Sequence, residues 1–401
     1  MSRRLATSTL GLVGSQALYN GGLAIEFVLI VNWFGDIGQG SYSYALALAG
    51  LFEVGVHWGS QHLVNRDAAA RFEDLKERLP GLFAASILTI ACVVVAIDAL
   101  HGPALATIAG AALVRAGAML LGAICIGRGN IVAPAVARIL SPLLALLVMW
   151  FVVRPDPTLP KLALATVAAT IGYAGPLWIA VRRLGLPRPA GPSDWWPAWR
   201  KLAGILWPYL LLFFLSQLLF RVDGAVLKWL ADEVLVARYM RAFKWIEGLF
   251  FLPHVVASAA IPVLVAASQN KEQSQGRILL QVAIVLALGL TVVSGALLVV
   301  APPILELLLG AGFAESKPLF EALVWTLPVH GLGIYLAAAL ITQRLERSLL
   351  SVVVIAAMVG ISAKLVGYSL GGPPLFIGGL YLGLIVHTLG CAWCLWRRRP
   401  V

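Results

Sequence analysis

Long apolar runs separated by short polar connections make up most of the chain. Twelve such runs lie at roughly 8–34, 39–63, 80–100, 103–126, 131–153, 160–182, 202–228, 235–268, 278–300, 318–342, 348–369 and 375–396. A helix needs about 20 apolar residues to cross the hydrocarbon core of a bilayer, which is about 30 Å thick. The pattern predicts an all-α polytopic membrane protein with about 12 transmembrane helices.

The longest connection, residues 184–201, divides the runs into two sets of six. It is rich in proline and carries Trp195, Trp196 and Trp199 beside Arg200 and Lys201. Tryptophan favours the headgroup level of a membrane, and basic residues favour its inner surface. We therefore predict two pseudo-symmetric lobes, an N-terminal lobe at 1–183 and a C-terminal lobe at 202–401, joined by a cytoplasmic interfacial linker at 184–201.

Composition agrees with a membrane protein, because 60% of the residues are hydrophobic, only 12% are charged and the mean hydropathy is +0.89. The formal charge of +11 does not indicate nucleic acid as a partner, because the basic residues are spread over the connections. With the N-terminus inside, the inner connections hold 19 Lys and Arg and the outer ones five. The positive-inside rule then places both termini in the cytoplasm.

A weak internal repeat relates the two halves at an offset of 197 residues. It places Glu26 on Asp223, Asp36 on Glu233 and Tyr42 on Tyr239. Two acid-on-acid matches beside a shared tyrosine favour a duplication, as expected for transporters built from parallel repeats.

The eighth run begins with a basic stripe, in which Arg238, Arg241, Lys244 and Glu247 recur at every third residue. At about 100° per residue these side chains share one drifting helix face. A charge near the bilayer centre costs about 2.5 to 3.5 kcal/mol on insertion scales. Either Glu247 pairs with Lys244 while the arginines reach lipid headgroups, or the cations line a cavity that holds an anionic substrate group. We favour the second interpretation.

Acidic residues concentrate in the first two runs of each half. Glu26 and Asp223 either cap a helix or pair with a cation such as Arg221 or Arg238, or they change protonation during a transport cycle. Glu53 and His57 have i,i+4 spacing and share a helix face. That pair is interpreted either as a proton relay or as a satisfied internal contact.

The sequence carries no motif for catalysis or nucleotide binding, since GxxxxGK[ST], HExxH and GxSxG are absent. Cys391 and Cys394 form a single CxxC, which we interpret as two small apolar helix residues. Six dispersed histidines suggest no metal site. We expect no cofactor, no metal and no enzymatic activity, and predict a transport function.

Three segments resemble bacterial polysaccharide-biosynthesis flippases of the multidrug/oligosaccharidyl-lipid/polysaccharide exporter superfamily. They are Trp33-Phe-Gly-Asp-Ile-Gly-Gln-Gly-Ser-Tyr42, the pattern from Tyr239 to Glu247 that leads through Leu252-Pro253 to Ile261-Pro-Val-Leu264, and Leu308-Leu-Gly-Ala-Gly-Phe-Ala314. The resemblance spans nearly the whole chain. It implies alternating access between two six-helix lobes in the bacterial cytoplasmic membrane.

The resemblance also implies the substrate, an undecaprenyl-diphosphate-linked oligosaccharide such as an O-antigen unit, which moves from the inner to the outer leaflet. The diphosphate would contact Arg238, Arg241 and Lys244, and an H⁺ or Na⁺ coupling ion would act at Glu26, Glu53 or Asp223. Expected partners are this lipid-linked oligosaccharide, membrane lipids and a polysaccharide polymerase or other assembly proteins. Alternatives are a lipid II flippase, an exporter of drugs or other amphiphiles, and a polysaccharide polymerase or lipid-linked glycosyltransferase.

Overall fold

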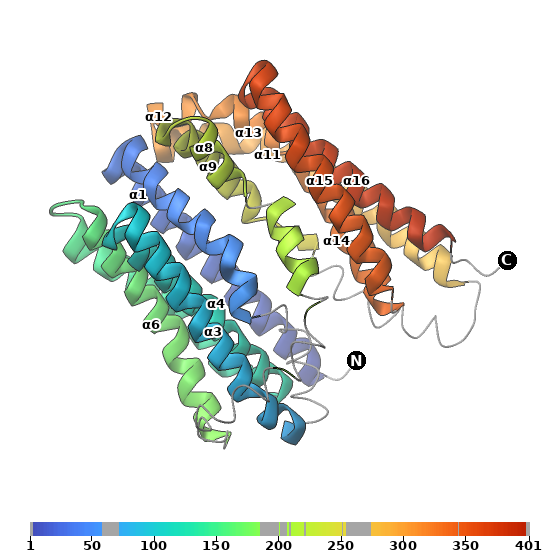
Figure 1. Ribbon diagram of the computed structural model, residues 1–401, viewed down its shortest axis with the longest axis horizontal. Helices are drawn as coiled ribbons and strands as arrows, with labels where there is room; N and C mark the ends of the chain where they lie inside the picture. The colour runs from blue at the N-terminus through green and yellow to red at the C-terminus, as the bar shows by residue number, and fades with distance from the viewer. Residues whose placement is uncertain are drawn as a thin grey trace. The chain divides into compact units, whose positions relative to one another are not determined.

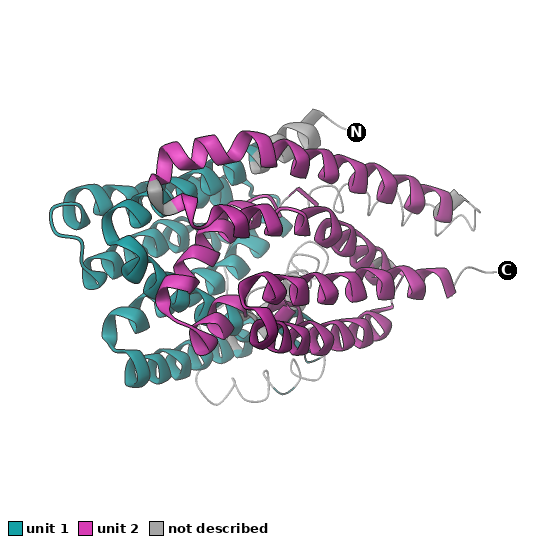
Figure 2. Ribbon diagram, turned by 90° about the horizontal axis from the view of Figure 1, so that it is seen from above, with its two compact units in different colours: residues 1–214 teal, residues 215–401 magenta. Residues whose placement is uncertain are grey.

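A computed structural model describes most of the chain, and every regular element in the part it describes is a helix (Figure 1). The described residues are 3–57, 72–184, 200, 207, 210–219, 222–250, 252–253, 274–343 and 345–397. They form two compact units, residues 1–214 and residues 215–401 (Figure 2). The predicted linker at 184–201 lies outside the described residues except at its first residue and at residue 200.

Unit 1 is a bundle in which α4 is the central helix. Its helices are α1 (Arg3–His57), α3 (Phe72–His101), α4 (Pro103–Gly127), α5 (Val132–Val148) with the π-helical extension η1 (Met149–Val153), and α6 (Leu159–Arg183). Helix α4 packs against α1, α3 and α6, and α5 packs against α1 and α6. Apolar clusters fill the contacts, for example around the fully buried Leu113 and Ile124.

Helix α1 is far longer than one membrane crossing. Its 55 residues are two helices joined across a kink, and each is long enough for one crossing of about 20 residues. Gly35 interrupts it with φ 62° and ψ −168°, between the two runs predicted at 8–34 and 39–63. The two predicted helices are therefore both present within α1, and they meet at Gly35 in a backbone conformation that other residues avoid.

Unit 2 contains α8 (Asp223–Leu230), α9 (Glu233–Glu247), α11 (Ser274–Leu309), α12 (Ala311–Ala314), α13 (Lys317–Leu323), α14 (Thr326–Thr342), α15 (Glu346–Gly371) and α16 (Pro373–Arg397). Helices α15 and α16 run side by side along their lengths, as the red pair in Figure 1 shows. The approach is so close that a Cβ atom at Gly379 would lie 2.3 Å from the backbone nitrogen of Lys364. Helix α14 packs against α16 and α11, and α9 packs against α8 and α13.

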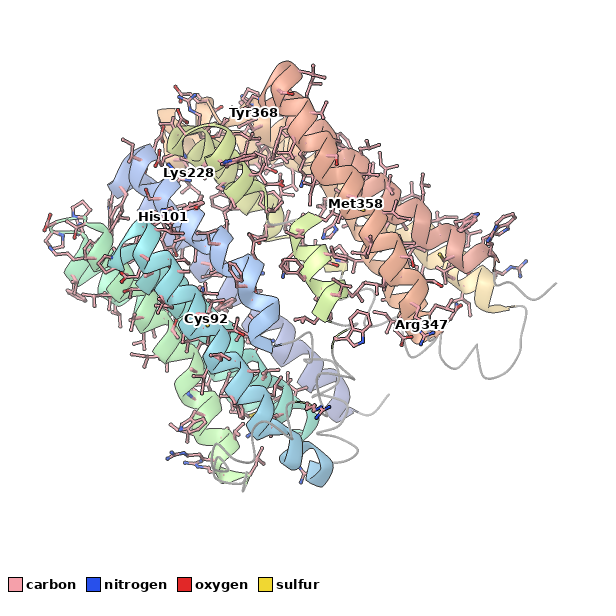
Figure 3. All side chains as sticks on the ribbon, in the orientation of Figure 1. Cys92, His101, Lys228, Arg347, Met358 and Tyr368 are labelled. Atoms are coloured by element: carbon pink, nitrogen blue, oxygen red, sulfur yellow. The ribbon has the colours of Figure 1, made fainter. Side chains whose placement is uncertain are left out.

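Helix length and apolar character identify a multi-pass membrane protein. Among the described residues, nine helices are long and apolar enough to cross a membrane, or ten if Leu210–Leu219 and Asp223–Leu230 form one bent span. Large apolar side chains project from the outer faces of these helices, such as Met358 on α15, which is 66% exposed (Figure 3). Such surfaces suit contact with lipid chains.

Candidate functional site

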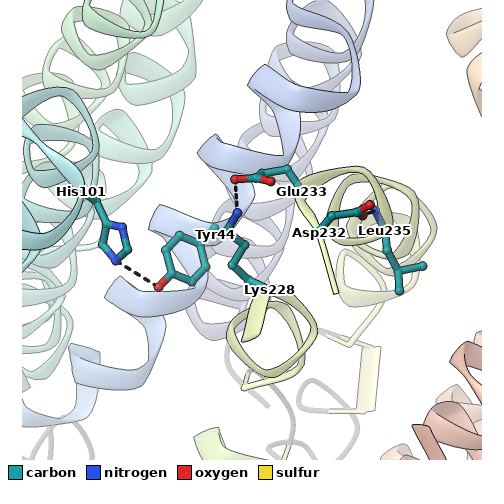
Figure 4. Close-up of polar contacts among 6 residues, drawn as sticks. All are labelled: Tyr44, His101, Lys228, Asp232, Glu233 and Leu235. Carbon is teal, nitrogen blue, oxygen red and sulfur yellow. Dashed lines mark hydrogen bonds and ion pairs between the residues drawn. The ribbon is translucent and has the colours of Figure 1, made fainter. Parts of the chain in front are cut away.

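Helix α9, which carries the predicted basic stripe, begins at a well-defined cap. The Asp232 side chain accepts a hydrogen bond from the Leu235 backbone nitrogen at 2.8 Å, as a helix N-cap does. Lys228 at the end of α8 pairs with Glu233 in the first turn of α9 (Figure 4). Together these contacts fix the short connection between the two helices.

The three cations of α9 lie in three different environments. Arg238 is 37% exposed and its Nη2 lies 2.5 Å from Glu315 Oε2. Arg241 is 1% exposed and is among the largest fully buried side chains. Lys244 Nζ lies 2.6 Å from Glu247 Oε2, and this pair is half-buried. The local pairing of Lys244 with Glu247, which the sequence left as an alternative, is therefore present, while the arginines do not share a single environment.

Asp223, the first residue of α8, lies at the centre of a buried polar cluster. Its Oδ1 is 2.5 Å from Lys364 Nζ of α15, and both side chains are almost wholly buried. Lys364 also donates to the backbone oxygen of Leu219 at 2.8 Å. The Tyr239 hydroxyl of α9 donates to the second carboxylate oxygen of Asp223. Pairing of Asp223 with a cation was one of the alternatives, with Arg221 or Arg238 as examples, and the observed cation is Lys364. Arg221 itself lies outside the described residues.

Unit 1 holds a related cluster around Glu26. The Tyr42 hydroxyl donates to Glu26 Oε1 at 3.2 Å, and the Glu26 side chain is 4% exposed. Arg115 of α4 is the cation in electrostatic range of both groups. Thr166 of α6 also contacts the Tyr42 hydroxyl. Helices α1, α4 and α6 thus meet at one buried carboxylate.

The two clusters follow the repeat seen in the sequence. In each unit the tyrosine follows the carboxylate by 16 residues. A break in the helix lies between them, at Gly35 in unit 1 and at Asp232 in unit 2. The cations differ in type and in position, because Arg115 lies on α4 and Lys364 on α15. The carboxylate and tyrosine are therefore shared features of the two units, and the cation is specific to each.

Three more predicted residues, Glu53, His57 and Glu247, lie on α1 and α9. Glu53 is half-buried near the end of α1. The side chain of His57 lies outside the described part of the chain, so its pairing with Glu53 stays a prediction. Glu247 forms an ion pair with Lys244.

The sequence analysis does not single out Lys364, which lies within the apolar run at 348–369. A usable signal was present, because Lys364 is the only charged residue between Arg347 and the end of α15 at Gly371. A single ammonium at that depth needs a partner. Its partner could not be read from local spacing, since Asp223 lies 141 residues earlier.

No metal centre is found in the residues that the structure describes, where no group of three His, Cys, Asp or Glu side chains could hold an ion. The four cysteines are free. Cys391 is buried with its sulfur 3.8 Å from His387 Nε2, and Cys92 lies exposed on α3 (Figure 3).

The helical architecture in two units can be compared with known proteins. No protein-family model and no curated protein sequence matches the chain. Similarity to solved structures confirms the expected fold class, an all-α polytopic membrane protein with about 12 transmembrane helices in two lobes.

Three solved structures illustrate the likeness. The chain is similar to the lipid II flippase MurJ in an inward closed conformation, with a TM-score of 0.72 and 12% identity over 98% of this chain and 87% of that chain. It is similar to the eukaryotic MATE transporter AtDTX14, with a TM-score of 0.70 and 13% identity over 99% and 97% of the two chains. A mutant of the Vibrio cholerae MATE transporter VcmN gives a TM-score of 0.66 and 14% identity over 99% and 97%. The structural similarity establishes the fold. At these low sequence identities it does not identify the substrate.

Proposed function

We propose that the chain is a flippase that moves an undecaprenyl-diphosphate-linked oligosaccharide, such as an O-antigen unit, from the inner to the outer leaflet of the bacterial cytoplasmic membrane. The observation that carries this proposal is the basic helix α9, in a fold that the chain shares with a lipid flippase. Three cations lie within seven residues of this one helix. A diphosphate is the kind of group that such cations bind, and arginine suits its oxygens through bidentate contacts.

Substrate binding would use the cations in an order set by their present contacts. The Lys244–Glu247 pair is a local contact of half-buried side chains, and such pairs contribute only about 0 to 1 kcal/mol. A diphosphate oxygen can therefore replace Glu247 at low cost. Arg241 is buried, so its contact with substrate requires a second conformation in which α9 or its neighbours move, as alternating access supplies.

Coupling to H⁺ or Na⁺ forms part of the proposal. The candidate groups are the acidic residues and the histidine singled out in the sequence, which are Glu26, Glu53, His57, Asp223 and Glu247. Glu26 is the candidate buried in unit 1, where Arg115 lies within electrostatic range.

The test is a strain that lacks the protein, complemented with the wild type or with Arg241→Ala/Lys244→Ala. Lipid-linked oligosaccharide should accumulate in the inner leaflet and be cleared only by the wild type. A variant with Lys317→Ala, which breaks an exposed pair with Glu306 in the same unit, serves as the control and should clear it too. Normal surface polysaccharide in the strain without the protein would overturn the assignment.

A second candidate is export of drugs or other amphiphiles, which is favoured by one buried carboxylate per unit and by the likeness to MATE transporters. It predicts that the strain without the protein becomes sensitive to cationic drugs and keeps its surface polysaccharide. Accumulation of lipid II in the same strain would instead identify the lipid II alternative. A polymerase or glycosyltransferase would leave shortened glycans rather than untranslocated ones.

A further inference from the structure

Lys364 has more contacts than a simple ion pair. Its ammonium, 1% exposed, donates to Asp223 Oδ1 at 2.5 Å and to the Leu219 backbone oxygen at 2.8 Å. The ring of Phe376 on α16 lies 6.0 Å from Nζ. An ammonium has three protons to donate, and this one is held by a carboxylate, a carbonyl and an aromatic face.

These acceptors belong to two helices that are bent by 50° relative to each other, Leu210–Leu219 and α8. Leu219 is the last described residue of the first helix, and Asp223 begins α8. The amino end of a helix carries partial positive charge, which favours an anion such as Asp223 at the start of α8. Lys364 therefore joins α15 to both helices.

The same cluster reaches α9 through Tyr239. The Tyr239 hydroxyl donates to Asp223, and its ring meets Phe376 edge-on with centroids 5.9 Å apart. Tyr239 lies between Arg238 and Arg241 on α9. Since the tyrosine is held at both its ring and its hydroxyl, the rotation of α9 about its axis is tied to the Lys364–Asp223 pair. The Lys364–Asp223 pair therefore also determines the direction in which Arg238 and Arg241 project from α9.

We propose that Lys364 is a positioning residue that fixes α8 relative to the helix Leu210–Leu219 and, through Asp223 and Tyr239, the rotation of α9. Asp223 then serves as the fixed partner of an internal ammonium, which removes it from the coupling candidates of the proposed function. This role for the basic helix rests on the proposed function, whereas the mechanical role of Lys364 does not. A buried ion pair adds little net stability compared with apolar packing, so its value lies in selecting one arrangement.

The test is a distance measurement within unit 2 that needs no substrate. Spin labels are placed at Trp229→Cys on α8 and Leu370→Cys on α15, which are 77% and 75% exposed, in a full-length chain whose four native cysteines are replaced by alanine. Double electron–electron resonance spectroscopy then reports the distribution of distances between the labels on α8 and α15. The unmodified Lys364 background should give a single narrow distribution.

Loss of the ammonium should broaden that distribution. Lys364→Met, whose side chain is only one heavy atom shorter, should broaden the distance distribution. Lys364→Ala should broaden it too, and added ethylammonium should make it narrow again. The small cation can enter the space left by the lysine and restore the contacts with Asp223 and Leu219. Lys317→Met is the matched control, because Lys317 forms an exposed pair with Glu306, and it should change nothing.

Each result decides the proposal. A narrow distribution in Lys364→Met, or a broad one in Lys364→Ala that ethylammonium leaves unchanged, overturns it. If neither variant yields folded protein, Asp223→Asn removes the opposite charge with little change in shape, and an unchanged distribution there also overturns it. Absence of oligosaccharide flipping in the wild type would overturn the proposed function. The distance measurement would still test the positioning role of Lys364, because it needs no substrate.

Discussion

The Tyr42 hydroxyl donates a hydrogen bond to Glu26 in unit 1, as the Tyr239 hydroxyl donates to Asp223 in unit 2. In both units the partners are 16 residues apart and a helix break lies between them. The structure therefore supports the weak repeat seen in the sequence. Because a buried carboxylate needs hydrogen-bond donors, both units retain the tyrosine. The two cations do not follow the repeat, which indicates that the units have come to neutralise their carboxylates by different routes.

Removing the Tyr239 hydroxyl should destabilise the protein. In Tyr239→Phe the ring keeps its contacts with Phe243 and Phe376, so the loss reports the missing donor to Asp223. Leaving a buried acceptor without its donor costs about 1 to 3 kcal/mol. Equilibrium unfolding in mixed micelles measures the change. Tyr44→Phe is the control, because Tyr44 makes an exposed contact with His101 at 3.2 Å (Figure 4). Equal losses in the two variants would contradict this account.

Asp223→Ala should cost far more than loss of an exposed acid in the same unit. It leaves the Lys364 ammonium buried without its anion, which costs about 3 to 5 kcal/mol. Glu306→Ala breaks a pair whose side chains are 46% and 41% exposed, and solvent screening limits that loss to about 0 to 1 kcal/mol. The double variant Asp223→Ala/Lys364→Met should lose less than the two single variants together. An additive result would show that the charges are not coupled.

Gly379→Ala should destabilise the contact between α15 and α16. The added methyl group would lie 2.3 Å from the Lys364 backbone nitrogen, so the helices must separate, and such overpacking costs about 1 to 3 kcal/mol. The neighbouring Gly378→Ala is the matched control, because nothing lies within 4 Å of its Cβ position. That variant should be neutral, or more stable by up to about 1 kcal/mol through helix propensity. Thermal unfolding in detergent compares the two, and the reverse order would refute the close contact.

Gly35→Ala tests the break in α1. Gly35 has φ 62° and ψ −168°, a conformation that costs other residues about 1 to 3 kcal/mol. Gly21→Ala, within the helical part of α1 and with open space at its Cβ position, should not be destabilising. The unfolding free energy of both variants checks the expectation. A Gly35→Ala protein as stable as the wild type would mean that the helix tolerates straightening at this residue.

The sequence predicts the helices well, because each must bury its backbone polar groups over about 20 residues of apolar side chains. Runs at 103–126 and 160–182 agree with α4 and α6 to within one residue at each end. It predicts one helix end less well, since α11 continues through the mostly apolar residues 301–309 to Leu309 rather than ending near residue 300. Pro302 and Pro303 lie within that extension.

The candidate site could be predicted only in part. The offset of 197 residues brought Glu26 and Tyr42 onto Asp223 and Tyr239 because duplicated chains keep their spacing. The burial of Arg241 could not be read from its place in a basic stripe, because helical periodicity gives a direction and not the neighbour on that side. Lys364 and Asp223 are brought together by tertiary packing alone, which no local pattern records.

The separation of Lys364 and Asp223 along the chain also sets the order in which unit 2 can be completed during synthesis. Lys364 is made 141 residues after Asp223, and at about 5 to 20 residues per second the ribosome takes about 7 to 28 seconds to reach it. Asp223 is therefore made well before Lys364, and Tyr239 is made between the two. The buried contacts of Asp223 in unit 2 are therefore completed only after α15 has been made, and a chain released before α15 lacks the cation that pairs with Asp223.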